Sequence, residues 1–154
     1  MSIIIRRAGI EDAGHVAKAV DDLLLELFQT EPVGPERVKS TAGLLARTDD
    51  LVAFLAFDGD TVAGALTLST CFAVYAAGPF GEIAELYVAP AYRSKKVGAA
   101  LIDRAIEHAR EKRWPSLKVG APPADTWSRT VDFYKGYGFH EIGPRLGLEL
   151  TEQA

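Results

Sequence analysis

The residues with the clearest potential for chemistry form a basic turn between a strand and a helix. The segment at residues 86–99 begins with an apolar run. It then carries Arg93, Lys95 and Lys96, just before a stretch of helical periodicity. The first turn of a helix has unpaired backbone N–H groups and the positive end of the helix dipole, and both attract anions. Gly98, which has no side chain, lets a ligand approach the backbone closely. The segment therefore predicts a diphosphate-binding turn. The alternative is a solvated basic loop that caps the helix, which the order of strand, basic turn and small-residue helix start disfavours.

Residues 85–101 resemble the acyl-CoA-binding motif of the GNAT superfamily of N-acetyltransferases. That motif reads Arg/Gln-x-x-Gly-x-Gly/Ala and opens a helix after a strand that often reads Glu-Leu-Tyr-Val-x-Pro. Arg93, Gly98 and the run at residues 85–88 match it, whereas Lys96 occupies the first glycine position. Glycine there eases a tight turn, and a lysine would compensate in part by contacting phosphate. The resemblance implies acetyl-CoA as co-substrate. It implies that the pantetheine arm bonds backbone groups of Leu86, Tyr87 and Val88, and that the pyrophosphate bonds Arg93, Ser94, Lys95, Lys96, Val97, Gly98 and Ala99.

A second segment, at residues 127–139, strengthens the resemblance. It is similar to the family's Asn-x-x-Ala-x-x-Phe-Tyr-x-x-x-Gly-Phe and keeps its two Phe positions, its Gly and its Tyr134. Trp127 replaces the asparagine and Thr130 the alanine. The resemblance places Trp127 and Tyr134 at the acyl-CoA site.

The implied role of Tyr134 is that of a general acid. When an amine displaces coenzyme A, the leaving thiolate needs a proton, and a phenol with a reference pKa of about 10 suits a thiol of about 8.5. A tyrosine also stays protonated at neutral pH. The alternative is that Tyr134 only packs beside Phe133 in the core.

Glu85 and Glu82 are the candidates for the general base. An amine with a pKa near 10.4 is mostly protonated at pH 7 and must lose a proton before it attacks. The two residues differ by three positions, so regular alternation puts them on opposite faces, and a bulge would bring both to one face. Each is equally well explained as a solvated strand carboxylate, and Glu85 is slightly preferred as the base.

Apolar periodicity and turn residues predict the elements that position these groups. Helices are expected from about residue 10 and at residues 34–46, 97–112 and 127–135. Residues 72–81 contain two glycines and a proline and are expected to form a loop. Strands are expected at residues 3–7, 51–57, 61–71, 82–88, 117–120, 139–142 and 146–150.

This order predicts an α/β (α+β) fold with a mixed sheet, because antiparallel hairpins precede a β-α-β-α-β section. The resemblance covers the whole element order. It implies a mostly antiparallel sheet with splayed central strands, flanked by helices, and one N-acetyltransferase domain over residues 1–154.

Composition narrows the function. The chain has 154 residues with a net charge of −4, which disfavours a broad nucleic-acid-binding surface. It shows neither a signal peptide nor an apolar run long enough for a membrane span. Its single cysteine, Cys71, is expected to be a small buried hydrophobe and agrees with a reducing compartment, so a cytoplasmic protein is predicted.

No metal is predicted, because His15, His108 and His140 show no ligand spacing and surface positions explain them. The acceptor is expected to be a small-molecule or peptide amine, and a cationic one is favoured by acidic residues on the first two helices. Solvated helix faces are the commoner explanation for those acidic residues. They are Asp21, Asp22, Glu26, Glu31 and Glu36.

Two other functions are open. The first is a CoA-binding regulatory domain without turnover, which the changed positions Lys96 and Trp127 favour and Tyr134 disfavours. The second is another nucleotide-phosphate module, although the chain lacks Gly-x-x-x-x-Gly-Lys-Ser/Thr. By resemblance only, a homodimer is also expected.

Overall fold

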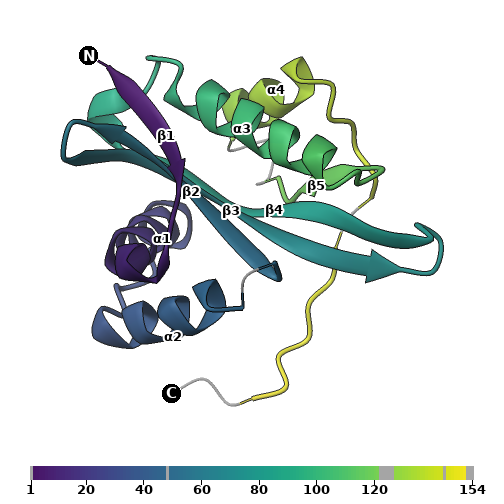
Figure 1. The fold of residues 1–154 in the computed structure, drawn as a ribbon, viewed down its shortest axis with the longest axis horizontal. Helices are drawn as coiled ribbons and strands as arrows, with labels where there is room; N and C mark the ends of the chain where they lie inside the picture. The colour runs from purple at the N-terminus through teal and green to yellow at the C-terminus, as the bar shows by residue number, and fades with distance from the viewer. Residues whose placement is uncertain (1, 48, 122–126, 144, 152–154) are drawn as a thin grey trace. The chain divides into compact units, whose positions relative to one another are not determined.

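A computed structural model describes residues 2–47, 49–121, 127–143 and 145–151, and the chain divides into two compact units, residues 1–120 and 121–154. The larger unit contains a five-stranded sheet whose strands lie side by side in chain order (Figure 1). The first four strands are antiparallel and the last pair is parallel, which confirms the mixed, mostly antiparallel sheet. The strands are β1 (Ile3–Arg7), β2 (Leu51–Asp58), β3 (Thr61–Ala73), β4 (Gly78–Val88) and β5 (Leu117–Val119).

Helices cover both faces of this sheet. A short 3-10 turn, η1 (Ile10–Asp12), leads into α1 (Ala13–Phe28), which is followed by α2 (Pro35–Leu45). These two helices lie on one face, and α3 (Val97–Glu111) lies on the other (Figure 1). Another short 3-10 turn, η2 (Pro90–Tyr92), precedes α3.

The core follows the apolar periodicity of the sequence. On the first face, buried residues of α1 and α2 pack against apolar residues of β2 and β3, among them Val16, Leu45, Leu55 and Ala65. Burial of such side chains contributes roughly 1.5–3 kcal/mol each and is the main stabilising term of the sheet.

α3 packs so closely on the opposite face that β3 needs a glycine there. A Cβ added to Gly64 would lie 2.7 Å from the carbonyl oxygen of Tyr87 and 3.2 Å from a methyl group of Leu101. A side chain at position 64 would therefore clash with the backbone of β4 and press against α3.

One expectation for α3 was wrong. His108 is not a surface residue: it is 3% exposed, with its ring 5.8 Å from that of Phe54 and 5.5 Å from that of Trp114. Position 108 lies seven residues after Leu101, so it shares the stripe of α3 that faces the sheet. Burial lowers the pKa of His108, which favours the neutral imidazole.

The loop expected at residues 72–81 is also wrong. β3 continues to Ala73 and β4 begins at Gly78, which leaves a short turn between them. Residues 71–80 form a two-stranded arm beyond the last β2 pair, at Ser69, and the first β5 pair, at Gly81. This arm projects from the sheet in Figure 1 and contains no charged residue. Cys71 lies in it and is half-buried instead of buried.

The strands β4 and β5 separate after a short paired stretch. They are paired at Gly81 with Leu117, Glu82 with Lys118, and Ile83 with Val119. β5 then ends, whereas β4 continues to Val88. The pairing thus stops at Ile83, and residues 84–88 of β4 lie beyond it.

The smaller unit contains α4 (Ser128–Gly136). The two closing strands expected at residues 139–142 and 146–150 are not formed among residues 139–143 and 145–151. The alternating Leu146, Leu148 and Leu150 are exposed instead, at 99%, 83% and 88%. Alternation alone does not make a strand, because a strand also needs a hydrogen-bonding partner.

Candidate active site

The turn between β4 and α3 presents three cationic side chains at the start of a long helix. Arg93, Lys95 and Lys96 are all exposed, and α3 begins at the next residue, Val97, which is buried. The N-terminal turn of α3 adds backbone N–H groups and the positive end of its dipole. Gly98 and Ala99, the next two residues, are half-buried and bring no bulk to this turn. The structure thus brings together the residues predicted to bind a diphosphate.

Lys96 has a backbone conformation that glycine adopts more easily. Its φ and ψ angles are 64° and 16°, in the left-handed region, and Ser94 has a φ of 63°. A residue with a Cβ loses about 1–2 kcal/mol in this region. Lysine, which stands at the first glycine position of the motif, therefore adopts this turn conformation at a cost in backbone strain.

Arg93 is already engaged. Its Nη2 lies 2.5 Å from Oε2 of Glu26 on α1, and its Nε donates to the carbonyl oxygen of Val88 at 3.0 Å. The guanidinium also lies 5.9 Å from the centre of the Tyr87 ring. These contacts hold Arg93 beside the end of β4.

A β-bulge lies in the middle of β4. Thr67 of β3 is opposite Glu85 and the next residue of β3, Leu68, is opposite Ile83, so Ala84 is the extra residue. Glu82 is opposite Ser69. Thr67 and Ser69 are two positions apart and share a face of β3, so the bulge places Glu82 and Glu85 on one face of β4.

That face is the one covered by α1 and α2, because Thr67 and Ser69 continue the row of Ala65. Both glutamates are half-buried. The carboxylate of Glu85 accepts a short hydrogen bond from the hydroxyl of Thr67, a residue that sequence reasoning missed. A signal existed: threonine interrupts an otherwise apolar run from Val62 to Leu68.

Tyr134 and Trp127 lie in the smaller unit. Trp127 precedes α4, and Tyr134 is 7% exposed within it, with its ring 5.6 Å from that of Phe133 and 5.8 Å from that of Phe139. Burial raises the pKa of Tyr134 to about 12. The phenol is therefore protonated at neutral pH, as a proton donor must be.

The acidic residues of the first two helices are less available than the sequence suggested. Asp21 is 6% exposed, bonds Arg37 at 2.5 Å and accepts from the backbone N–H groups of Val33 and Gly34. Burial acts to raise the pKa of Asp21, but these donors outweigh it and the pKa is lowered. Asp22 pairs with Lys18 at 2.7 Å, and Glu26 with Arg93. Three of the five carboxylates are thus ion-paired.

A pocket of about 260 Å³ lies between α1 and the C-terminal end of β4. Charged side chains of α1 and of the β2–β3 turn line it, including Lys18, Asp22 and Asp60, and Tyr87 contributes from β4. Burial raises the pKa of Tyr87, and the nearby Asp22 acts in the same direction. The pocket lies beside Tyr87 and Ala89, next to the predicted cofactor-binding strand.

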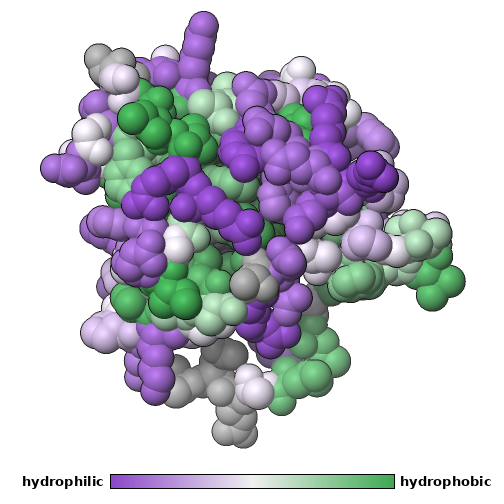
Figure 2. Space-filling model, viewed as in Figure 1, coloured by the Kyte–Doolittle hydropathy of each residue, from purple (hydrophilic) through white to green (hydrophobic). Residues whose placement is uncertain are grey.

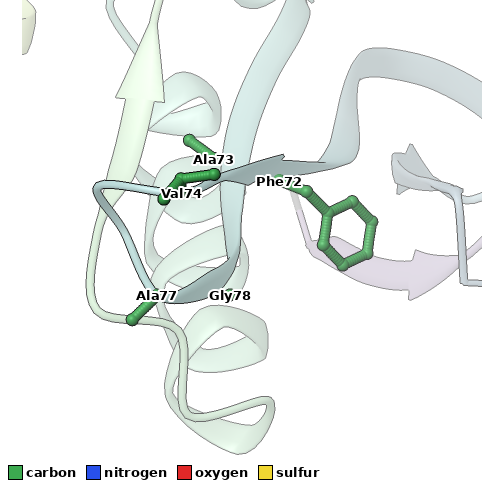
Figure 3. A pocket seen from close by; sticks show the side chains of 5 residues that line it. All are labelled: Phe72, Ala73, Val74, Ala77 and Gly78. Atoms are coloured by element: carbon green, nitrogen blue, oxygen red, sulfur yellow. The ribbon is translucent and has the colours of Figure 1, made fainter.

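A wider hollow of about 500 Å³ lies on the projecting arm, away from this chemistry (Figure 3). It is lined by Phe72, Ala73, Val74, Ala77 and Gly78, and in Figure 3 the ring of Phe72 points away from Ala77. Figure 2 shows the projecting end of the molecule as hydrophobic. The hollow offers no titratable group and is not part of the candidate active site.

Two absences hold for residues 2–47, 49–121, 127–143 and 145–151. No three His, Cys, Asp or Glu side chains gather there in a way that could hold a metal ion. No helix in these stretches has the length and apolar character to cross a membrane.

Comparison with known proteins places the chain in a family. The model of the Acetyltransferase (GNAT) family matches residues 17–139. A curated relative, an uncharacterised N-acetyltransferase of Archaeoglobus fulgidus, is 35% identical over 69 residues, which are 45% of this chain and 47% of the relative. The match thus spans about half the length of that relative.

Solved structures share the fold at low sequence identity. A predicted acetyltransferase from Clostridium acetobutylicum, solved with acetyl-CoA, has a TM-score of 0.80 at 20% identity and covers 97% of both chains. An aminoglycoside acetyltransferase from an uncultured soil metagenomic sample has a TM-score of 0.79 at 19% identity, over 98% of this chain and 97% of its own.

Proposed function

Because the chain belongs to the acetyltransferase (GNAT) family, we propose that it moves an acetyl group from acetyl-CoA to a primary amine by direct transfer in a ternary complex. The amine is a small cationic molecule or a lysine-like side chain. One observation carries the proposal: the strand that leads into the basic turn also carries two carboxylates on one face and separates from its neighbour beside them.

The described residues fit acetyl-CoA. The pyrophosphate would contact the turn at residues 93–99, where three cations precede the N-terminus of α3. The pantetheine arm would bond backbone groups of Leu86, Tyr87 and Val88, which lie past the last β4–β5 pair, at Ile83. The peptide-like pantetheine can bond the edge of β4 there, because β5 no longer covers that edge. Trp127 would complete the cofactor site.

The transfer needs three proton movements. Glu85 or Glu82 would accept a proton from the ammonium group of the acceptor, directly or through water. The amine nitrogen would then attack the thioester carbonyl carbon, whose oxygen would be polarised by a backbone N–H near Val88. As the C–N bond forms and the C–S bond breaks, Tyr134 would give its proton to the departing thiolate. The nitrogen would lose its second proton to solvent, from which the phenol of Tyr134 is protonated again.

A cationic acceptor suits the charges of this face. Two glutamates share it, and Asp60 lines the pocket beside Tyr87. Ion pairing of Asp21, Asp22 and Glu26 leaves fewer acidic groups for an acceptor than their number suggests. The aminoglycoside acetyltransferase of the same fold is a precedent for a small polycationic acceptor.

The remaining parts of the proposal rest on the sequence. We propose that residues 1–154 act as one N-acetyltransferase domain, in the cytoplasm, without a nucleic-acid or membrane partner. The net charge of −4 and the single cysteine support this. A homodimer is proposed from the family resemblance alone.

A thiol-release assay with acetyl-CoA and pooled amines tests the function. We expect release of coenzyme A with cationic amines and a melting temperature that rises with acetyl-CoA. At one hundred times its dissociation constant, acetyl-CoA should stabilise the fold by about 2.7 kcal/mol, which corresponds to roughly 5–10 °C for a chain of this size. Binding without release across the panel would identify a regulatory CoA-binding domain. No response at millimolar acetyl-CoA would refute both functions.

A further inference from the structure

Thr67 is a buried polar residue that the proposed chemistry does not yet use. It lies in the middle of β3, is 2% exposed, and has Leu66 and Leu68 as neighbours in the strand. Its register partner on β4 is Glu85, at the point where the β3–β4 register shifts. Burial of a hydroxyl there costs free energy unless it is hydrogen-bonded, so its hydrogen-bond partners indicate its role.

The hydroxyl of Thr67 makes two hydrogen bonds, both to Glu85. Its oxygen accepts from the backbone N–H of Glu85 at 3.1 Å. Its proton is donated to Oε1 of the Glu85 carboxylate in a short hydrogen bond. One hydroxyl therefore links the backbone just after the extra residue, Ala84, to the side chain that the bulge redirects.

Only a few side chains can make this pair of contacts. Serine and threonine combine a donor and an acceptor on one atom close to the backbone. Valine has nearly the shape of threonine and neither function. Glu82, opposite Ser69, lies on the same face of β4.

We propose that Thr67 is a positioning residue that holds the carboxylate of Glu85 toward the acceptor amine. This rests on the proposed function, in which a strand glutamate removes the proton of the amine. Thr67 itself touches neither substrate. Its two hydrogen bonds fix the backbone at the bulge and the orientation of the Glu85 carboxylate, so the base is already oriented before each turnover.

The test compares Thr67→Val with Thr67→Ser in the full chain. For Thr67→Val we expect kcat/KM to fall roughly tenfold to a hundredfold, as displaced catalytic groups do. Thr67→Ser should recover most of the rate. Affinity for acetyl-CoA should be the same in all three proteins.

A readout that does not need turnover separates this proposal from the function. Hydrogen exchange of the Glu85 amide, which donates to the Thr67 hydroxyl, should be faster in Thr67→Val than in the natural protein and in Thr67→Ser. A natural protein without turnover would refute the proposed function, and equal exchange of this amide in all three proteins would still refute the role of Thr67. Equal losses of rate and melting temperature in both variants would mean that Thr67 is only structural.

Discussion

The guanidinium of Arg93 and the carboxylate of Glu26 form an ion pair of 2.5 Å between the basic turn and α1. The side chains are 43% and 34% exposed, so solvent screens the pair and its contribution is modest. Its position matters more than its strength. The residue predicted to bind a pyrophosphate is held by a carboxylate, which an incoming diphosphate has to replace.

Removing that competition should tighten cofactor binding. An exposed pair contributes about 0.2–1 kcal/mol, so Glu26→Gln should bind acetyl-CoA about 1.5- to 5-fold more tightly at low salt. Calorimetric titration at two salt concentrations measures this. Glu31→Gln, the loss of an exposed carboxylate just after α1, is the control for net charge. Weaker binding in Glu26→Gln would show that Glu26 presents Arg93 to the cofactor instead of withholding it.

Replacement of Lys96 should separate backbone strain from charge. Glycine removes a strain of about 1–2 kcal/mol but loses about 0.5–1 kcal/mol to greater freedom in the unfolded chain, so Lys96→Gly should gain up to about 1.5 kcal/mol of stability. Lys96→Ala keeps the Cβ and should gain nothing. Chemical denaturation of both variants measures the difference.

Both Lys96 variants should bind acetyl-CoA more weakly than the natural protein. The loss should shrink at high salt, where charge contacts with phosphate are screened. Titration of both variants at low and high salt tests this. Tighter binding by Lys96→Gly at every salt concentration would mean that the lysine hinders the cofactor, contrary to the compensation expected here.

Tyr134→Phe should lower turnover by about a hundred- to ten-thousand-fold, the usual contribution of a general acid. The ring remains, so the contacts with Phe133 and Phe139 and the melting temperature should persist. With a pKa of about 12, the natural phenol stays protonated through neutral and moderately alkaline pH, and no alkaline loss of activity should come from Tyr134 there.

The matched control is Tyr137→Phe in the next turn of the chain, which should leave turnover almost unchanged. The measurement requires an acceptor slow enough for chemistry to limit the rate. Normal turnover of Tyr134→Phe would remove Tyr134 from the mechanism. Loss of cofactor affinity and melting temperature together would assign it a packing role.

Asp12 should make the stability of the fold depend on pH. Arg6 donates to both of its carboxylate oxygens at 2.8 Å, and the N–H of Gly9 donates at 2.9 Å. The hydrogen bonds from Arg6 lower the pKa of Asp12 to about 2, from an unfolded value of about 3.9. The stabilisation is therefore complete above about pH 4 and is lost as pH falls through about 2.

Asp12→Asn should lower the melting temperature at pH 7 by roughly 3–10 °C, the effect of losing a buried charged partner. The difference in melting temperature between Asp12→Asn and the natural protein should become smaller as the pH falls from 4 to 2. Thermal melts across that range test it, with Asp103→Asn, an exposed aspartate of α3, as control. A difference that is constant with pH would mean that ionisation of Asp12 does not contribute.

Sequence reasoning placed most elements because their apolar periodicity is complete within each segment. The stripe of α3 is an example, and only its polar member, His108, was misjudged, since a neutral imidazole can replace an apolar residue against Phe54 and Trp114. The bulge in β4 could be proposed but not located, because its extra residue depends on pairing with β3.

Residues 72–81 were mistaken for a loop partly because Gly81 and Pro79 are explained by the surrounding sheet and not by a turn. A Cβ at Gly81 would lie 2.4 Å from the ring of Trp114, so the glycine makes room for an indole that comes from beyond α3. Pro79 is tolerated because that part of β4 lies outside the pairing with β5, where a missing N–H breaks no ladder. Thr67 was missed for a related reason: its partner is distant in sequence.

The projecting arm and the central strands should differ in how their backbone hydrogen bonds open. Residues 71–80 pair only with each other along the strands, whereas Phe54 and Leu66 are completely buried between neighbouring elements. A two-stranded hairpin alone is marginally stable in water. The amide hydrogens of the arm should exchange with solvent through local fluctuations, whereas those of the central strands should exchange only on global unfolding. The strand that carries the proposed catalytic glutamate thus begins in a part of the sheet that should open by local fluctuation.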